Sequence, residues 1–559
     1  MKPDLTGRLQ ALDPIIKAIC SATGAPGLSL GVARGGSIFH TAHYGYRDVE
    51  KALPPDSDTA YGVASLTKSF VASAMGIVVD EGRLSWTTPV KNILPELNSQ
   101  DPLVTEQLTI TDLFIHNTGL ASSNHWWYGA DGELLLRKDQ TLAAFKALKQ
   151  KGKFRAQYSY SNWPYCVAGE VIEKVSGQSF GTFLQQRILG PLHLSRTSAA
   201  HDNNSDQNLA KPYAVLDNGE AFLLPFPKTG DGQIMAPAQA VRSSVNDMLK
   251  YGSALLEAQK AELAAGQTLP ESNPLRGAAT QLSAHITKTA QSPEFLLERT
   301  YGFGMERFQL PQAVDGVGCN SMFVKQMPKL VPGPNSKGGL LLVHTGSIAG
   351  YSSMLALLPE HDIVAFAVAN SVGLGDPSGW VVQALVETIS ESENTTDFVS
   401  LAKEAAANHA RREVDNMKVL EDHRTPDTQP RPLDEYVGTY VGLAGLFGIL
   451  IRRRRRSAGE EGLEVLFQGL ESQAWPLTHY HFDTFTWIQP FNEQARRARF
   501  NLVGPDLFKI RFMAGEEEEE GNGKTGETVI DRVCWMQEPG LLEKDQCFLR
   551  EKKELRRQL

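Results

Sequence analysis

The pattern of predicted elements changes near residue 400, and this change constrains the fold of the 559-residue chain more than any other feature. Residues 1–395 alternate helical and strand patterns, whereas short strand-like runs separated by turns fill 433–559. The segment between them, 396–432, is polar and helical and then rich in turn residues, which is typical of a linker. We therefore predict two domains, as expected for a chain too long for one ordinary core.

The first region carries signals for both strands and helices. Two apolar runs flank the Gly35-Gly36 pair, which predicts a β-hairpin. A helical pattern over 67–81 ends before Gly82, the usual position past a helix end. Three later apolar runs predict consecutive antiparallel strands at 339–344, 351–358 and 363–370.

The second region is predicted to form a small β-barrel or sandwich. Its like-charge runs, arginines at 452–456 and glutamates at 516–520, are interpreted as solvated loops. A nuclear address or an anion site is the alternative for the arginine run. The strand-like runs lie at 436–440, 462–468, 484–488, 498–503, 507–512 and 528–536.

Composition narrows the function classes. A net charge of −9 provides no field that would attract nucleic acid or an anionic membrane. The five cysteines are odd in number and widely spaced, so we expect neither a disulfide framework nor a zinc site. No secretory signal and no run long enough to span a bilayer is found, which predicts a cytoplasmic protein. His479 and His481 alternate on a predicted strand but lack a third ligand, so no metal and no cofactor is expected.

Ser65 and Lys68 stand at the start of the predicted helix over 67–81. Residues three apart share a helix face, so Lys68 can reach the Ser65 hydroxyl. A lysine accepts a proton from serine only when burial or nearby positive charge lowers its pKa. The backbone N–H of Ser65, at a helix N-terminus, can stabilise a developing oxyanion. A pair this short is also compatible with a structural accident.

Two further groups of residues occur in order along the chain. Tyr160-Ser161-Asn162 precedes a predicted helix, and His344-Thr345-Gly346-Ser347 ends a predicted strand. With the Ser65 motif, they resemble the serine β-lactamase and penicillin-binding-protein clan, most closely its class-C-like branch. That branch also holds carboxylesterases, D-aminopeptidases and the acyltransferase of lovastatin biosynthesis. Flanking segments at 108–120, 169–177, 188–192 and 244–249 are similar to the family as well.

The resemblance implies an α+β fold, in which helices flank an antiparallel sheet beside an all-helical subdomain. It also implies that Ser65 is the nucleophile, that Lys68 and Tyr160 share proton transfer, and that Asn162 contacts Lys68 and the substrate. The oxyanion hole would be the backbone N–H groups of Ser65 and Ser347. A tyrosinate beside an ammonium would have a lowered pKa, which suits a base. The alternatives are a core tyrosine at position 160 and a helix cap at position 162.

The third motif departs from the β-lactamase pattern, because His344 stands where those enzymes carry lysine. That lysine binds a substrate carboxylate, whereas neutral histidine is a poorer anion anchor and a good hydrogen-bond donor. The resemblance therefore points to esterase, amidase or acyl-transfer chemistry, with Thr345 and Gly346 touching the substrate. A histidine simply packed in the sheet is the alternative.

Two more features bear on the substrate and the second domain. Trp126 and Trp127 are predicted to form an apolar substrate wall, with packing of their loop against the core as the alternative. Segments 433–440 and 477–485 resemble the lipocalin-like domain that follows some β-lactamase-related proteins, which implies a small antiparallel β-barrel.

These observations predict a serine hydrolase that cleaves an ester or amide of a small, partly apolar metabolite or peptide through an acyl-enzyme on Ser65. The first alternative is an acyltransferase, in which an alcohol or amine replaces water. The second is a catalytically dead binding or scaffold protein. The only predicted partner is the small-molecule substrate, with homo-oligomer formation left open.

Overall fold

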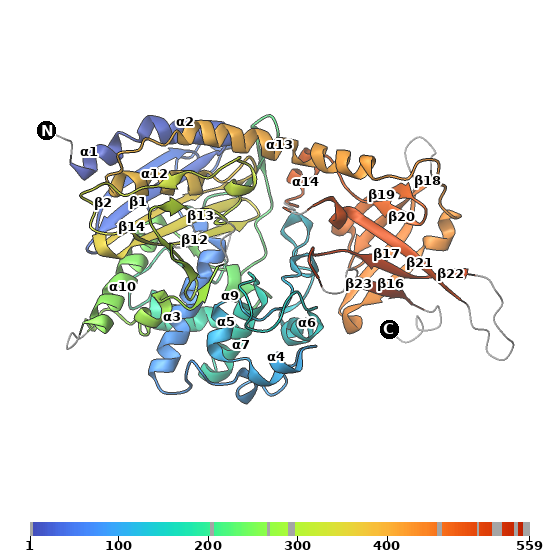
Figure 1. The fold of residues 1–559 in the computed structure, drawn as a ribbon, viewed down its shortest axis with the longest axis horizontal. Helices are drawn as coiled ribbons and strands as arrows, with labels where there is room; N and C mark the ends of the chain where they lie inside the picture. The colour runs from blue at the N-terminus through green and yellow to red at the C-terminus, as the bar shows by residue number, and fades with distance from the viewer. Residues whose placement is uncertain are drawn as a thin grey trace.

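The computed structural model shows an α+β domain beside a closed barrel (Figure 1). It describes residues 4–201, 206–264, 269–288, 297–455, 461–499, 502, 504–516, 528–541 and 546–551. The predicted α+β class and C-terminal β-barrel are confirmed. The boundaries at 395 and 433 stay predictions.

An antiparallel sheet of eight strands forms the centre of the α+β domain, in the order β2-β1-β14-β13-β12-β9-β8-β7. The predicted hairpin is β1 and β2, and the three predicted consecutive strands are β12, β13 and β14. The strand bounds are β1 (Gly27–Arg34), β2 (Ser37–Gly45), β7 (Ile286–Thr287), β8 (Arg299–Tyr301), β9 (Glu306–Gln309), β12 (Leu340–Ile348), β13 (Tyr351–Leu358) and β14 (Ile363–Ala369).

The central strands are buried on both faces, which is why their sequences are continuous apolar runs. Every residue of β13 is buried, and successive side chains point to opposite sides of the sheet. Met354 and Ala356 belong to the hydrophobic cluster that includes α12, whereas Leu355 and Leu357 belong to the one that includes α3 and α10. Helices α1 (Leu5–Gln10), α10 (Val245–Leu263) and α12 (Pro377–Ile389) contact the sheet, and α2 (Asp13–Thr23) and α13 (Phe398–Asp422) pack together beside α12.

Helices also form a separate group below the sheet in Figure 1. Its central member, α3, is buried from Thr67 to Val78. Thr109 and Asp112 form a reciprocal capping pair at the start of α5. The group comprises α3 (Thr67–Asp80), α4 (Pro102–Gln107), α5 (Ile110–Phe114), α6 (Thr141–Ala147), α7 (Trp163–Ser176), α8 (Phe180–Leu184), α9 (Ala236–Gln239) and α11 (Ala278–Leu282).

Short strand pairs connect these parts. β3 (Tyr61–Gly62) pairs with β6 (Arg242–Ser243), immediately before the Ser65 turn. The others are β4 (Tyr213–Val215) with β5 (Ala221–Leu223) and β15 (Ser371–Val372), and β10 (Gln312–Ala313) with β11 (Lys329–Leu330).

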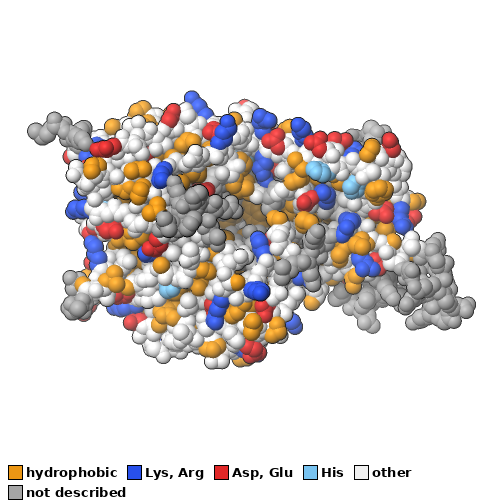
Figure 2. Space-filling model, in the orientation of Figure 1, with side chains coloured by type: hydrophobic (Ala, Val, Ile, Leu, Met, Phe, Trp, Pro, Cys, Tyr) orange, Lys and Arg blue, Asp and Glu red, His pale blue; other side chains and the backbone are white. Residues whose placement is uncertain are grey.

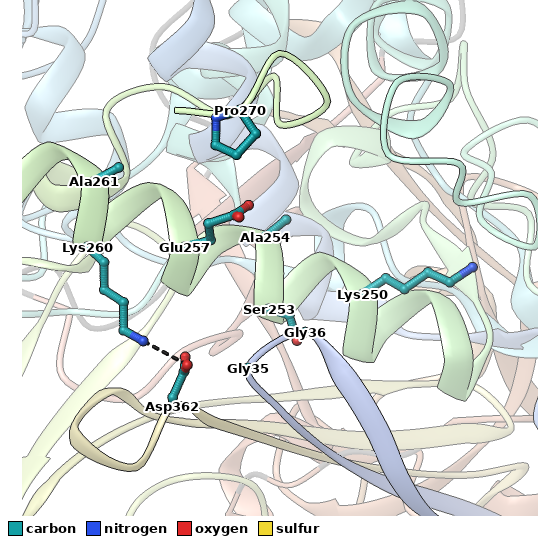
Figure 3. A pocket seen from close by; sticks show the side chains of 10 residues that line it. All are labelled: Gly35, Gly36, Lys250, Ser253, Ala254, Glu257, Lys260, Ala261, Pro270 and Asp362. Carbon is teal, nitrogen blue, oxygen red and sulfur yellow. Dashed lines mark ion pairs between the residues drawn. The ribbon is translucent and has the colours of Figure 1, made fainter. Parts of the chain in front are cut away.

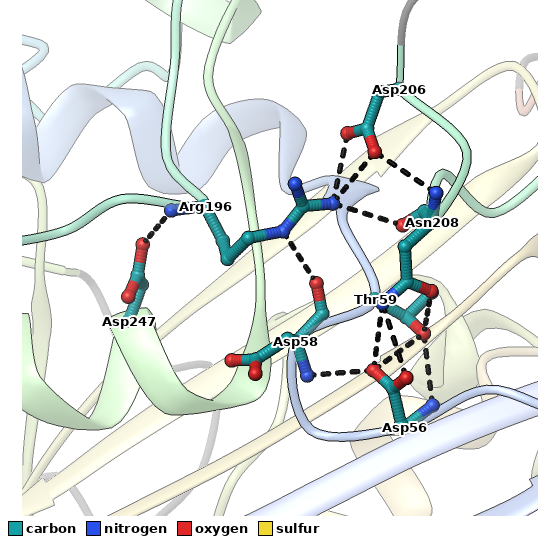
Figure 4. Close-up of polar contacts among 7 residues, drawn as sticks. All are labelled: Asp56, Asp58, Thr59, Arg196, Asp206, Asn208 and Asp247. Atoms are coloured by element: carbon teal, nitrogen blue, oxygen red, sulfur yellow. Dashed lines mark hydrogen bonds and ion pairs between the residues drawn. The ribbon is translucent and has the colours of Figure 1, made fainter.

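A polar network anchors the chain just before β3 (Figure 4). The Arg196 guanidinium donates to both carboxylate oxygens of Asp206 at 2.9 Å and to the Asp58 carbonyl at 2.8 Å. The Arg196 backbone N–H donates to Asp247 on α10 at 2.7 Å. The segment that leads to Ser65 is thereby tied to α10 and to the 206–208 loop.

The eight barrel strands close on themselves, so that no sheet edge is left open. The interior is aromatic, with Trp475, Trp487, Trp535 and Phe508 at most 1% exposed. The strands are β16 (Gly438–Gly442), β17 (Phe447–Arg455), β18 (Glu461–Phe467), β19 (Ala474–His481), β20 (Thr484–Thr486), β21 (Lys509–Glu516), β22 (Thr528–Trp535) and β23 (Gln546–Arg550).

Three expectations for this region need correction. The predicted strand at 498–503 is wrong where it is described, because Ala498 and Arg499 follow helix α14 (Phe491–Arg496) as irregular chain. Residues 500, 501 and 503 lie outside the described residues. The arginine run lies on strand β17 rather than in a loop, up to Arg455. Its side chains pair with carboxylates, Arg452 with Glu464 and Glu471 among them, which opposes a free anion site.

A disulfide between Cys534 and Cys547 is the third correction. These residues face each other in the register of β22 and β23, a relation that their sequence spacing does not reveal. Of the glutamate run, 517–520 lies outside the described residues.

The surface carries both signs of charge. Figure 2 shows lysine and arginine side chains interspersed with aspartate and glutamate over one face. Within the described ranges, none of the helices combines the length and the apolar character that crossing a membrane requires.

Candidate active site

Ser65 sits in a tight turn between β3 and α3, a single 3-10 turn over Ala64–Leu66. Ala64 adopts a φ of +47°, a left-handed conformation that costs energy for a residue with a Cβ. The turn is braced from behind, because Thr67 Oγ1 donates to the Ala64 carbonyl at 2.7 Å and accepts from the Val241 N–H at 3.0 Å. The serine hydroxyl is thus held at one end of a buried helix.

Lys68 lies directly beside the Ser65 hydroxyl. Its Nζ is 3.0 Å from Ser65 Oγ, 2.8 Å from Asn162 Oδ1 and 3.1 Å from the Ala238 carbonyl oxygen. Burial lowers the pKa of Lys68 to about 7. A neutral amine is therefore available near neutral pH to accept the serine proton.

Tyr160 approaches the same oxygen from another side, with its hydroxyl 3.1 Å from Ser65 Oγ. The expected tyrosinate is wrong for this structure. Burial raises the pKa of Tyr160 above its ordinary value, and the hydrogen bond with Ser65 offsets only part of that rise. A raised pKa favours the neutral Tyr160 hydroxyl, which can donate a hydrogen bond, whereas the lowered pKa of Lys68 favours its neutral amine.

Asn162 occupies the N-cap position of α7, but its side chain makes no capping bond. Instead its Oδ1 accepts from Lys68, and its Nδ2 donates to Asn124 Oδ1 at 3.1 Å. The predicted contact with Lys68 is therefore present in the structure.

His344 is 4% exposed and both of its ring nitrogens have partners inside the protein. Its Nδ1 lies 2.7 Å from the Thr345 carbonyl, and its Nε2 lies 3.2 Å from the Tyr301 hydroxyl. The Tyr301 hydroxyl in turn lies 3.2 Å from His116 Nε2, and His116 Nδ1 accepts from the Ser161 N–H at 3.2 Å.

The Ser161 donor sets the direction of this hydrogen-bonded chain. His116 must carry its proton on Nε2 and donate to Tyr301, which then donates to His344. Burial, assisted by the charge of Lys68, lowers the pKa of His344 to about 3. With both ring nitrogens bonded inside the protein, His344 fits the alternative of a histidine packed in the sheet. Its place among the catalytic residues stays a prediction.

The rest of the third motif runs along the edge of the site. A Cβ at Gly346 would lie 2.1 Å from the Val63 carbonyl oxygen, so only glycine lets β12 approach the Ser65 turn this closely. Thr345 is partly exposed and Ser347 is exposed. The predicted oxyanion hole of the Ser65 and Ser347 backbone N–H groups stays a prediction.

Trp126 and Trp127 do not form a substrate wall. Their side chains are 0% and 4% exposed, so neither presents a face to a ligand. Trp126 packs edge-on against Trp163, and Trp127 Nε1 donates to Asn124 Oδ1 at 3.2 Å. The alternative, in which this loop packs against the core, is correct, because burying two large indole rings stabilises the fold.

Sequence reasoning missed several polar partners of the site. Tyr301, His116, Asn124 and the Ala238 carbonyl all contact it, yet they lie far apart in the chain. His116 falls in the 108–120 segment, which offered a signal. Nothing in the sequence around Tyr301 or Asn124 marked them.

Other candidate places are chemically poorer. A surface pocket of about 500 Å³ lies between the β1–β2 turn, α10 and Asp362, and contains no residue of the predicted site (Figure 3). The ion pair of Lys260 with Asp362 at 2.8 Å crosses it. The described residues contain no group of three metal-ligand side chains. His479 and His481 are separated by a β-bulge.

The sheet with its helical group, and a serine that shares hydrogen bonds with a buried lysine and a tyrosine, define a serine-hydrolase fold of the β-lactamase type. The family model described as Beta-lactamase matches residues 12–387, and the chain belongs to that family.

Relatives and solved structures extend this assignment. Protein flp of Staphylococcus aureus (strain MRSA252) is 27% identical over 209 residues, 37% of this chain and 41% of that protein. Unguisins hydrolase ungD' of Aspergillus campestris (strain IBT 28561) is 23% identical over 66% of this chain and 63% of its own length. The match thus spans about two fifths of the flp protein.

Two solved structures share the fold. The octameric penicillin-binding protein homologue from Pyrococcus abyssi has a TM-score of 0.53 at 18% identity, over 96% of this chain and 99% of that one. The class C beta lactamase from Rhodobacter sphaeroides has a TM-score of 0.51 at 21% identity, over 69% of this chain and 99% of that one.

Proposed function

We propose that the protein is a serine hydrolase that cleaves an ester or amide of a small, partly apolar metabolite or peptide. One observation carries the proposal: Ser65 Oγ lies 3.0 Å from a buried lysine amine and 3.1 Å from a tyrosine hydroxyl. A serine with a base of lowered pKa on one side and a neutral donor on the other is suited to acyl transfer.

In the proposed reaction, neutral Lys68 removes the Ser65 proton as Oγ attacks the substrate carbonyl. The backbone N–H groups of Ser65 and Ser347 stabilise the oxyanion of the tetrahedral intermediate. The proton on Lys68, passed through Tyr160, reaches the departing alkoxide or amine, and the carbonyl re-forms as an ester on Ser65. Water then attacks that ester, its proton returns to Ser65 Oγ, and the acid leaves.

The surroundings of His344 favour substrates other than β-lactams. A neutral, internally bonded imidazole provides no cation for a carboxylate at that position. The relative named unguisins hydrolase supports hydrolysis over the alternative of transfer to an alcohol or amine. The polar contacts around Ser65 oppose a catalytically dead scaffold.

The test is labelling by a fluorophosphonate probe and turnover of a short-chain nitrophenyl ester. We expect Ser65→Ala to lose both by at least about 10⁴-fold. Ser253→Ala, at the remote pocket of Figure 3, is the matched control and should behave like the wild type. If the wild-type protein is neither labelled at Ser65 nor able to turn over the ester, the proposed enzymatic activity is refuted. Product analysis with added methanol or a primary amine distinguishes the two reactions, because transfer gives a methyl ester or an amide and hydrolysis gives the free acid.

Self-association and location belong to the proposal as well. The match to the octameric penicillin-binding protein homologue, over 96% of this chain, supports an oligomer, which light scattering after gel filtration would measure. The expected cytoplasmic location stays a prediction. The Cys534–Cys547 disulfide argues against it, because such bonds are rare in reducing compartments.

A further inference from the structure

The barrel contributes one buried carboxylate to the loop that borders the proposed site. Glu538 follows strand β22 and is 6% exposed. Its Oε2 accepts from Ser122 Oγ at 2.9 Å and from the Ser123 N–H at 2.7 Å, and its Oε1 accepts from Lys151 Nζ at 2.8 Å. Each of these three hydrogen bonds joins the barrel to the α+β domain. Hydrogen bonds to a charged acceptor are stronger than those between neutral groups.

Glu538 holds the loop in a conformation that the chain avoids on its own. Ser123 has φ +40° and ψ +44°, the left-handed region that residues with a Cβ rarely occupy. Such a conformation persists only where the surroundings over-determine it. The bond from the Ser123 N–H to the barrel carboxylate supplies that constraint, and Trp163 Nε1 donates to the Ser122 carbonyl at 2.9 Å on the other side.

The residue after Ser123 reaches the catalytic lysine through one intermediary. Asn124 Oδ1 accepts from Asn162 Nδ2 at 3.1 Å, and Asn162 Oδ1 accepts from Lys68 Nζ at 2.8 Å. A side-chain amide has one donor end and one acceptor end, so the Asn124 oxygen selects which end of Asn162 faces the lysine. The opposite orientation would aim the Asn162 NH₂ group at the Lys68 amine.

We propose that Glu538 of the barrel is a positioning residue for Lys68, acting through the Ser123 turn, Asn124 and the amide orientation of Asn162. The barrel is therefore part of the working enzyme rather than an appended module. This inference rests on the proposed function of Ser65 and Lys68.

A control on the same interface separates positioning from mere docking of the domains. Gln473 of the barrel is 0% exposed and bonds both backbone groups of Ala130, at 2.8 and 3.1 Å. Ala130 lies in the same loop but takes no part in the hydrogen bonds that lead through Asn124 and Asn162 to Lys68. Glu538→Ala and Gln473→Ala thus remove comparable links between the barrel and the loop, and only the first leads to Lys68.

The experiment measures the rate of Ser65 labelling by the fluorophosphonate probe, together with the thermal midpoint, in the full chain. We expect Glu538→Ala to slow labelling roughly 10- to 100-fold and Gln473→Ala to leave the rate near wild type even where both midpoints fall. Glu538→Gln, which keeps an oxygen for Ser122 and Ser123, should restore most of the rate.

A double-variant cycle tests the route. If Glu538 acts through Asn124, then Glu538→Ala in an Asn124→Ala background should cause no further loss of rate. Three outcomes would overturn the inference while leaving the proposed function intact. Glu538→Ala could label at the wild-type rate, Glu538→Ala and Gln473→Ala could lose equal rate, or the losses could multiply in the double variant. Wild-type chain unlabelled at Ser65 would overturn the proposed function, and the inference with it.

Discussion

The two domains bury polar groups in contrasting ways. The α+β domain surrounds Ser65 with buried Lys68, His116 and His344, which are linked in hydrogen-bonded chains. The barrel fills its interior with aromatic rings, and Glu538 and Gln473 bond to its neighbour. Burying a polar group costs free energy unless the group is hydrogen-bonded. A buried polar network can therefore mark a position where those groups have a role. Of the buried polar groups named here, Lys68 adjoins Ser65, whereas Glu538 and Gln473 join the two domains.

The sharpest test of this contrast is Lys68. Lys68→Ala removes the proposed base, and we expect labelling of Ser65 to fall by at least about 10³-fold. In the wild type the rate should fall about tenfold per pH unit below the pKa of about 7, because protonation removes the base, and should level off above it. A rate that keeps rising to pH 9 would contradict the lowered pKa. Lys68→Arg, which keeps a cation without a base, should also be inactive.

Trp126 tests whether the aromatic loop serves packing or binding. Trp126→Ala should lower the free energy of unfolding by about 3–5 kcal/mol, because it empties a buried indole site. Chemical unfolding measures this, and the KM of the folded protein for the nitrophenyl ester should change little. A raised KM with unchanged stability would reinstate the substrate wall. Tyr46→Ala, at a side chain that is 45% exposed, is the control.

Reduction of the disulfide tests the barrel alone. Among the described residues Cys534–Cys547 is the only disulfide, and Cys20, Cys166 and Cys319 are free. Reduction should cost about 3 kcal/mol of stability, since the bond closes a short loop between β22 and β23. Calorimetry with and without reductant measures the shift. Cys534→Ser should have a lower midpoint that reductant leaves unchanged; the same reductant effect in that variant would contradict the assignment.

Tyr301 gives the smallest expected effect. Tyr301→Phe leaves His116 Nε2 and His344 Nε2 without the hydroxyl between them, which should cost about 1–3 kcal/mol. Thermal unfolding compared with Tyr46→Phe measures it. A variant as stable as the wild type would mean that the chain of bonds from Ser161 to His344 contributes nothing to the fold.

The sequence by itself determined much of this protein. The spacing of Ser65 and Lys68 on a helix, the apolar runs that became β12 to β14, and the short strands of the barrel are local patterns, and periodicity is local. Resemblance then ordered Tyr160, Asn162 and His344 into one site.

Only the tertiary structure decided the rest, because burial and pairing depend on residues distant in the chain. It turned Trp126 and Trp127 inward, aimed the His344 proton at a neighbouring carbonyl, and joined Cys534 to Cys547. Burial also lowers the pKa of Lys68 and raises that of Tyr160, since desolvation is a property of the packed interior. The link from Glu538 to Asn124 crosses two domains, and no sequence pattern marks it.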